Sequence, residues 1–420
     1  MGIHKRQSYI VLASSTFSFI VCFMVWMMFA VIGVPLQKEL GLSETEFGIL
    51  TALPVLSGSL IRIPLGIWTD RYGGRIVFAL LMFSCVLPIY MLQFATAYWQ
   101  LLVIGLFIGL AGGSFSVGTP YVARWFSSEH QGLAMGIFGA GNAGAAVNKL
   151  IAPSIVAAWG WQMVASVYSA VMLGTAILFS FFSFSRKEHL VPSSITLRQQ
   201  LAMMKDPAVL RYCLYYAVVF GGYVALSLWM VHYYVDEYHY PLTQAAFLAA
   251  CFSLPGGVLR AWGGWLSDKY GAYRVTKYVM WLCLVIFFVL SFPRLNLSVI
   301  TTDQSHPLHF NLGINAFWFT VLLFFAGIAM AVGKASVFKF ISDEYPDNIG
   351  TVSGVVGLAG GLGGFVYPVI FGLLVDLTGI RASSFMLLFA TVIICIVWMQ
   401  FSRKENTVGH EVYKLAENSA

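Results

Sequence analysis

The chain has 420 residues, of which 59% are hydrophobic and only 10% are charged. A soluble domain is about 45–50% apolar and about 25% charged, so this composition excludes a soluble enzyme, a nucleic-acid-binding protein and a disordered chain. The net charge of +6 then concerns orientation, because basic residues are enriched on the cytoplasmic side of membrane proteins.

Apolar segments recur from one end of the chain to the other, each long enough to cross a bilayer as a helix of about 20 residues. The first begins at Tyr9 and no small-residue cleavage site follows it, which predicts a retained helix and not a signal peptide. Turn residues and charges separate the segments. Twelve transmembrane helices are predicted, over residues 9–34, 45–69, 75–95, 98–122, 131–157, 162–184, 209–234, 242–267, 274–292, 313–341, 348–374 and 381–401.

A polar stretch between the sixth and seventh helices divides the chain. We therefore expect an N-terminal six-helix bundle (1–184), a cytoplasmic linker (185–208), a C-terminal six-helix bundle (209–402) and a cytoplasmic tail (403–420). The predicted fold is an all-α integral membrane protein with 12 helices in two six-helix repeats, a plan known for transporters.

A repeated motif supports the two repeats. Residues 62–75 read RIPLGIWTDRYGGR and residues 260–274 read RAWGGWLSDKYGAYR. In each motif an arginine, Arg62 or Arg260, precedes an aspartate, Asp70 or Asp268, by eight residues, and the offset is 198 residues. A third relative, GLLVDLTGIR, spans 372–381.

Basic residues predict the orientation. Segments that would be cytoplasmic with the N-terminus inside hold 16 lysines and arginines, whereas the opposite side holds only Lys38, Arg294 and Arg381. This bias places both termini in the cytoplasm.

Positive charge inside the membrane is the most informative feature of the sequence. Sixteen cytoplasmic and three opposite residues leave five of the 24 lysines and arginines for the membrane interior, whereas all 18 acidic residues fall in loops, tails or helix ends; the five are Arg62, Lys149, Arg260, Lys334 and Lys339. A charge at the bilayer centre costs at least about 2.5–3.5 kcal/mol on insertion scales. Without an internal carboxylate, an external anion is the expected partner.

Arg62 and Arg260 form the strongest pair. Each lies eight residues before its loop aspartate, which is about 12 Å along a helix and close to the middle of an apolar core about 30 Å thick. The planar guanidinium fork matches planar oxyanions. The alternative is that each arginine binds backbone carbonyls and fixes its helix in place.

Two glycine-rich stretches, 132–153 and 350–368, occupy corresponding places in the halves. Small residues at such spacing let helices pack closely. Glycine can also bring backbone donors close to a small ligand.

These motifs resemble a known family. GIWTDRYGGR (66–75) is similar to the signature of the major facilitator superfamily. GAGNAGAAV (139–147) and GLAGGLGGFVYP (357–368) resemble the paired signatures of its nitrate/nitrite porters, and GLAGGSFSVGTPYVARWF (109–126) resembles their fourth helix. The resemblance implies a secondary transporter of nitrate, with nitrite as a second substrate, that works by alternating access in a bacterial inner membrane.

The resemblance also implies a binding site. Its arginines are matched by Arg62 and Arg260, its aromatic residues by Phe115 and Phe220, and its polar residues by Tyr216 and Asn142. The glycine stretches add Gly141, Gly144, Gly360 and Gly363. Two guanidinium groups can hold the edge of flat nitrate while two phenyl rings cover its faces, a slot that excludes tetrahedral sulfate and phosphate.

The short connection at 342–348 resembles the branch described as nitrate/proton symporters. No internal carboxylate can carry the proton, so Lys149, seven residues after Asn142 and on the same helix face, is the candidate. Lys339 is the second candidate, and the alternative for it is a side chain that extends to the cytoplasmic surface. Asp70 and Asp268 are expected to gate the cytoplasmic side through basic neighbours across the interface between the halves.

Other functions stay open at this point. They are a nitrate/nitrite antiporter, a carboxylate exchanger of the oxalate/formate type and, from another class, an anion-sensing receptor built like a transporter. An enzyme is not expected, because the sequence has no clustered Ser/His/Asp set, metal-ligand spacing or nucleotide motif. We expect no cofactor, metal or nucleic-acid partner, and a monomer that binds a small inorganic anion and a proton within the lipid bilayer.

Overall fold

The computed structural model describes residues 2–185, 205–299, 308–345 and 349–417. Most of the predicted linker, 186–204, lies outside this part of the chain. The first group of elements comprises α1 (Gly2–Trp26), α2 (Phe29–Leu40), α3 (Glu44–Leu60), α4 (Arg62–Tyr72), α5 (Gly74–Met91), η1 (Leu92–Phe94), α6 (Tyr98–Ile108), η2 (Gly109–Gly113), α7 (Ser114–Ala123), α8 (Ser128–Gly139), η3 (Ala140–Ala143), α9 (Gly144–Trp159) and α10 (Trp161–Phe182).

The second group follows the central stretch. It comprises α12 (Pro207–Tyr216), η6 (Ala217–Gly221), α13 (Gly222–Tyr238), α14 (Leu242–Val258), α15 (Arg260–Tyr270), α16 (Ala272–Leu290), β1 (Leu295–Val299), β2 (Leu308–Leu312), α17 (Ala316–Glu344), α18 (Ile349–Thr378) and α19 (Ser383–Glu417). The two strands form an antiparallel hairpin that pairs Leu295 with Leu312.

The bundle consists of helices, because a chain inside a membrane has no water to satisfy its backbone hydrogen bonds. Ten helical stretches of the described chain are long and apolar enough to span a membrane, and α14 with α15 makes an eleventh if their 48° bend is counted within one span. The remaining predicted segment, 131–157, folds as α8, η3 and α9. The all-helical membrane fold predicted from the sequence is confirmed.

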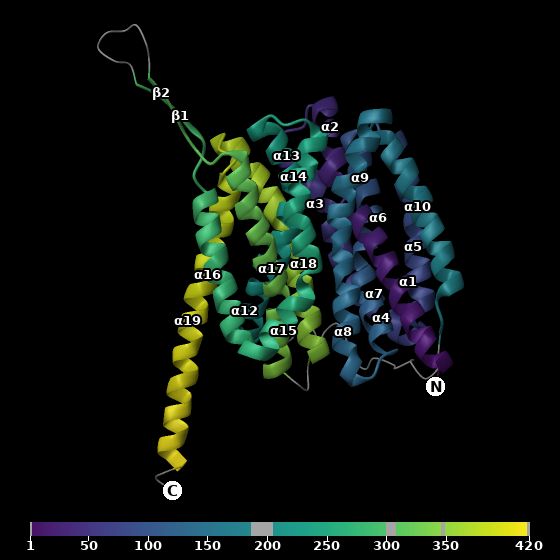
Figure 1. Ribbon diagram of the computed structural model, residues 1–420, viewed down its shortest axis with the longest axis vertical. Coiled ribbons are helices and arrows are strands. Elements are labelled where there is room, and N and C mark those ends of the chain that lie inside the picture. Colours follow the sequence, from purple (N-terminus) through teal and green to yellow (C-terminus); the bar gives the residue numbers. More distant parts are fainter. Residues whose placement is uncertain (1, 186–204, 300–307, 346–348, 418–420) are drawn as a thin grey trace.

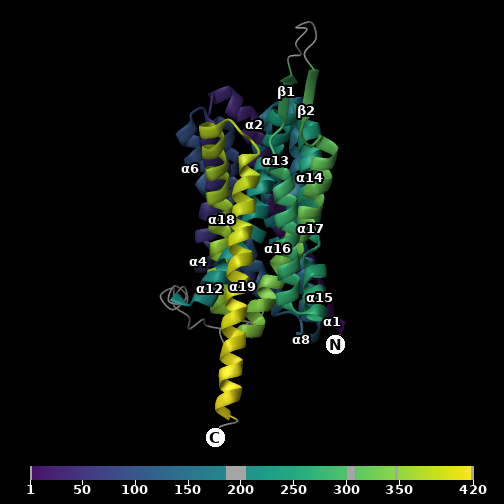
Figure 2. The same cartoon turned by 90° about the vertical axis from the view of Figure 1, so that its left-hand side faces the viewer.

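The two groups stand side by side (Figure 1). Both chain termini lie at one end of the bundle, called the near end here, and the strand hairpin projects from the opposite, far end (Figures 1 and 2). Contacts between the groups run along α3 with α18 and along α9 with α14. The boundaries of the two bundles remain a prediction.

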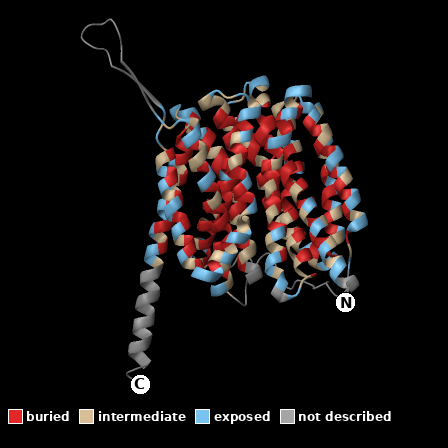
Figure 3. Ribbon diagram, in the orientation of Figure 1, coloured by how far each residue is buried: buried red, intermediate tan, exposed pale blue. Residues whose placement is uncertain are grey.

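Figure 3 shows that buried residues lie in the interior of the bundle. Buried side chains fill both groups and the seam between them. Large apolar side chains are exposed on the outer helices, such as Leu87, Phe181 and Leu377, which are 64%, 77% and 74% exposed. These residues form the surface that lipid would cover, because an apolar exposed surface of this extent is unfavourable in water.

Glycine permits the closest approach between the groups. A Cβ atom at Gly372 in α18 would lie 2.1 Å from the backbone oxygen of Glu44 in α3, and one at Gly48 would lie 2.4 Å from the backbone oxygen of Pro368. Backbone cannot yield at such distances, so these two positions fix how closely α3 and α18 pack.

Two substitutions in α18 test this. Gly372→Ala should lower the thermal midpoint of the purified protein by several degrees, because overpacking typically costs about 1–3 kcal/mol. Gly357→Ala is the matched control, since a Cβ there would meet no atom within 4 Å, and alanine favours a helix over glycine by about 1 kcal/mol. Equal midpoints for both variants, measured by scanning fluorimetry, would contradict the argument.

Candidate functional site

Arg62 and Arg260 lie at equivalent breaks in two helices. Each is the first residue of an 11-residue helix, α4 or α15. Each of these helices ends at a glycine with positive φ, 88° at Gly73 and 87° at Gly271. The motif repeated in the sequence is therefore repeated in local backbone structure.

The other predicted site residues also lie at irregular turns. Phe115 comes two residues after η2, Asn142 lies within η3, and Phe220 lies within the π-helix η6. Short 3₁₀ and π segments inside longer helices often mark functional positions. Glycine-rich sequence at these three places lets the helix depart from regular α geometry.

The arginines and phenylalanines pair across the seam. The guanidinium carbon of Arg62, from the first group, lies 5.3 Å from the ring centroid of Phe220 in the second. Conversely, Arg260 of the second group lies 5.1 Å from the ring of Phe115 in the first. A cation over an aromatic face is stabilised electrostatically, so each half supplies the ring that covers the other half's arginine.

Two further aromatic residues complete this arrangement. Trp26 lies 5.8 Å from the Arg62 guanidinium, and Phe338 lies 5.4 Å from that of Arg260. Sequence reasoning missed both, because a single aromatic residue within an apolar helix carries no positional signal in a chain with 34 phenylalanines.

Tyr216 joins the two arginines. Its ring stacks on Phe220 with centroids 5.2 Å apart and planes 7° apart, and its phenol accepts a hydrogen bond from Arg260. Arg62 and Arg260 are close enough for their charges to repel. The site thus concentrates two positive charges around one aromatic wall.

Some polar atoms at the site lack partners in the protein. Arg62 donates one hydrogen bond, of 3.3 Å, from Nη1 to the backbone oxygen of Gly357, whereas its Nε and the side-chain nitrogen of Asn142 are buried without a partner. Buried donors are normally satisfied. The unpaired Nε of Arg62 suits an anion, which can accept hydrogen bonds, and a contact of Asn142 with the same anion stays a prediction.

The predicted glycines pack against helices. A Cβ at Gly144 would lie 2.2 Å from the backbone oxygen of Ile20, and one at Gly141 would lie 2.2 Å from the ring of Phe19. Gly360 and Gly363 approach Tyr216 and Ala217 in the same way, at 2.4 and 3.1 Å. Close packing accounts for all four glycines, and direct contact with a ligand stays a prediction.

Two buried lysines contact α14 of the second group. Lys149 reaches it from α9 of the first group, and Lys334 reaches it from α17 of the second. Lys149 donates to the hydroxyl of Ser253 in α14 at 2.9 Å and to the backbone oxygen of Ala145 at 3.2 Å. Lys334 donates to the backbone oxygen of Gly256 at 2.6 Å. Neither lysine pairs with a carboxylate among the described residues.

Tyr223 connects the two lysines. Its hydroxyl donates to the backbone oxygen of Ser253 at 2.9 Å, and the Lys334 ammonium lies 3.6 Å from the centroid of its ring. The sequence counted Lys334 as an internal cation but gave no sign of this network.

Lys339 has carboxylate partners that the sequence did not predict. Its ammonium lies 3.0 Å from Asp343 and 3.5 Å from Asp268, and its side chain is 36% exposed. It was wrong to count Lys339 among the uncompensated internal charges, because α17 continues to Glu344 and brings an aspartate one turn further along the helix. The alternative of a side chain extended toward the surface fits this position.

The aspartates of the repeated motif also differ from expectation. Asp70 bonds to Arg124 of α7, in its own group, and Asp268 pairs with Lys339, again within one group. The expected ion pairs across the interface are therefore absent from the described near end. These contacts instead fasten the short helices α4 and α15 to their own bundles.

Comparison with known proteins bears on this site. The model of the Major Facilitator Superfamily matches residues 15–314 and 307–415. A Thermus thermophilus protein named probable nitrate/nitrite antiporter NarK1 is 38% identical over 93% of this chain and 91% of its own length. The nitrite extrusion protein of Bacillus subtilis (strain 168) is 29% identical over 96% of this chain and 97% of its own.

A solved structure shares the fold. It is a bacterial homolog of the human lysosomal transporter Spinster in an inward-facing, occupied conformation, and it matches with a TM-score of 0.68 and 15% identity. The match covers 94% of this chain and 96% of that one. At this identity the likeness concerns the arrangement of helices alone.

Proposed function

We propose that this chain, which belongs to the major facilitator superfamily, transports nitrate, and also nitrite, across the cytoplasmic membrane by alternating access. The observation that carries the proposal is the crossed pairing of Arg62 with Phe220 and of Arg260 with Phe115. Relatives named as nitrate or nitrite transporters at 29–38% identity support the choice of anion.

A flat anion suits this geometry. The two guanidinium groups would share hydrogen bonds with the three oxygens of nitrate, and the unpaired nitrogens of Arg62 and Asn142 would complete them. Phe115 and Phe220 would cover the faces of the anion. Because both halves hold the same anion, its binding would draw them together, which is the step that alternating access requires.

The basic residues set the proposed orientation. The sequence predicts sixteen lysines and arginines on the side of the termini and three on the other, so both termini would face the cytoplasm and the far end would face the outside. The chain would act as a monomer, since the site is formed within one chain.

For the driving force we propose a proton carried with nitrate by Lys149. Its ammonium lies at the seam with a hydroxyl and a carbonyl as partners, an arrangement that a neutral amine can also keep. Nitrate entry adds a negative charge nearby and favours the protonated form. By linkage, nitrate and the proton must then strengthen each other's binding equally.

Nitrate/nitrite exchange is the second candidate. It is favoured by the name of the Thermus thermophilus relative and by the lack of an internal carboxylate, because exchange needs no proton carrier. Proteoliposomes with purified protein separate the two mechanisms. Uptake driven by a pH gradient alone supports symport, whereas uptake that requires internal nitrite and ignores the pH gradient supports exchange.

The first prediction concerns the arginines. Arg62→Lys and Arg260→Lys should each abolish measurable nitrate binding although the charge is kept, because lysine cannot form the planar two-point contact. The loss should be on the order of 2–5 kcal/mol, as for one partner of a buried, hydrogen-bonded charge pair. Binding is measured by calorimetry on protein that elutes as a single species.

Arg71→Lys in the same helix, α4, is the control, since Arg71 is exposed near the end of that helix. It should leave affinity unchanged. Near-normal nitrate affinity in the Arg62→Lys or the Arg260→Lys variant would contradict the proposed binding site.

The second prediction concerns Asp70. Asp70→Asn should slow nitrate transport several-fold while nitrate affinity stays close to that of wild type, because Asp70 fastens α4 to Arg124 of α7 and does not reach the anion. Asp268→Asn should act in the same way through Lys339. Reduced affinity with an unchanged transport rate would place these aspartates in binding and not in gating.

The third prediction concerns coupling. Nitrate affinity of the wild type should fall as pH rises, since the proton that strengthens binding is lost. Lys149→Gln should flatten that dependence and stop uptake driven by a pH gradient, whereas the exposed Lys38→Gln should change neither. Nitrate accumulation by Lys149→Gln with a proton gradient as the only driving force would show that Lys149 is not the carrier.

A further inference from the structure

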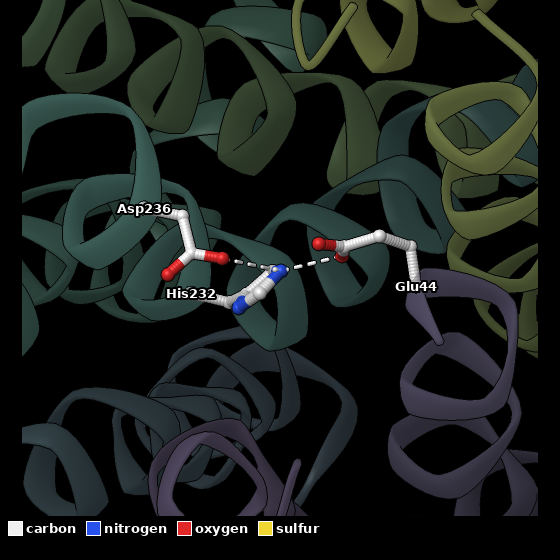
Figure 4. A group of neighbouring side chains, drawn as sticks. All are labelled: Glu44, His232 and Asp236. Atoms are coloured by element: carbon white, nitrogen blue, oxygen red, sulfur yellow. Dashed lines mark hydrogen bonds and ion pairs between the residues drawn. The ribbon is translucent and has the colours of Figure 1, made fainter. Parts of the chain in front are cut away.

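A cluster of charged residues lies at the far end, away from the arginine site. His232 and Asp236 of α13 face Glu44 of α3 (Figure 4). The Nε2 atom of His232 lies 2.6 Å from Oε2 of Glu44 and 3.4 Å from Oδ2 of Asp236. Glu44 belongs to the first group of helices and the other two residues to the second, so the imidazole bridges the seam.

Arg381, which precedes α19, completes the cluster. Its guanidinium lies 3.4 Å from Asp236 and 3.9 Å from Glu44. Further out, Asp376 of α18 binds the start of α3, and Glu237 is close enough to feel the charge of Arg381. Within the described chain, the ion pairs of His232 are those with Glu44 and Asp236.

Aromatic rings and carboxylates surround the His232 imidazole. The side chain is 2% exposed, and its ring lies 4.4 Å from that of Phe47 and 5.3 Å from that of Trp229. Aromatic faces attract a cation, and two carboxylates meet one ring nitrogen. With a neutral imidazole the four residues carry a net charge of −1, and with a protonated one they are neutral.

A divalent cation fits this place less well than a proton. The three ligand atoms lie within 4.8 Å of one another, as they would around a metal ion. However, the guanidinium of Arg381 already faces both carboxylates. One more positive charge neutralises the cluster, and a proton on histidine supplies one charge, whereas a divalent cation would supply two.

A second contact across the seam does not depend on histidine. The carboxylate of Asp376 accepts hydrogen bonds from the backbone nitrogens of Glu44 and Thr45, at 3.1 and 2.8 Å, and from the Thr45 hydroxyl at 2.5 Å. A carboxylate at a helix N-terminus satisfies donors that the helix leaves free. Asp376 and Arg381 both come from GLLVDLTGIR, the third relative of the repeated motif.

The ends of the bundle differ in this respect. At the far end, ion pairs join the two groups through Glu44. At the near end, each ion pair that the structure describes stays within one group, as for Asp70 with Arg124, Arg211 with Glu344, and Lys339 with its aspartates. The far end is therefore the end where ion pairs join the two groups, and one of those pairs contains an imidazole.

We propose that Glu44, His232, Asp236 and Arg381 form a proton-operated latch, in which protonation of His232 binds α3 to α13 and holds the far end closed. The latch rests on the proposed function in one respect only, the orientation that turns the far end toward the outer side of the membrane. An acidic exterior would then favour closure of the outer side. This proton acts on the conformation and needs no nitrate, unlike the proton assigned to Lys149.

Hydrogen exchange tests the latch. The backbone amides of Glu44 and Thr45, which Asp376 binds in the closed form, report on the far end. Full-length protein in lipid nanodiscs without nitrate is exchanged into deuterated buffer between pH 8 and 5.5, and each rate is divided by the intrinsic rate at that pH. Protection of wild-type residues 42–50 should rise at least about fivefold toward low pH, the lower end of typical coupling between two sites.

The variants separate the latch from other protonations. His232→Gln and Glu44→Gln should each lose the pH response, whereas His239→Asn, which removes an exposed histidine from the end of the same helix, should keep it. Asp376→Asn should lower protection at every pH. A flat wild-type profile, or a pH response retained by His232→Gln or Glu44→Gln, would overturn the latch.

Nitrate binding is measured on the same samples. His232→Gln that binds nitrate but has lost the pH response supports the latch and leaves the proposed function standing. If the wild type bound no nitrate, the proposed function would fail, and the exchange result would still decide the latch.

Discussion

The structure depends on how an apolar bundle accommodates positive charge without internal carboxylates. Among the described residues, the buried lysines and the two arginines rely on carbonyls, a hydroxyl and aromatic rings. Such partners satisfy hydrogen bonds but leave the net charge in place. Under the proposed function, an entering anion would be bound by charge that is already present, and the cost of burying that charge would contribute to the affinity.

Helix irregularity is the structural means by which this charge is concentrated. Arg62 and Arg260 begin half-helices, and Asn142 and Phe220 lie in turns that depart from α geometry. In a membrane such backbone is tolerated where protein surrounds it. Glycines near these turns are in close contact with neighbouring helices, as Gly144 is with Ile20. The same glycines therefore allow close helix packing and the irregular turns at the proposed site.

The sequence predicted the helices and the arginine pair because both follow from local pattern: apolar length for the helices, and an eight-residue spacing repeated at 198 residues for the arginines. It did not predict the partners of Lys339 or of the motif aspartates, since partner choice depends on where each helix ends and on which neighbour it meets. The Glu44–His232 contact was missed for the same reason, because residues 188 positions apart carry no shared spacing.

In the two proposals, the anion and the proton on His232 act at different places in the bundle. The proposed anion site lies at the seam and contains the arginines Arg62 and Arg260, whereas the far-end contact contains the imidazole of His232, which can bind a proton. A ligand shifts a conformational equilibrium only by the difference in its affinity for the two states. Nitrate would stabilise whichever state brings both arginines together, and a proton on His232 would stabilise closure of one end. Because the two influences act on different residues, a chain of this fold would gain or lose proton dependence at the outer end through changes at His232 or Glu44, without altering the arginines proposed to select the anion.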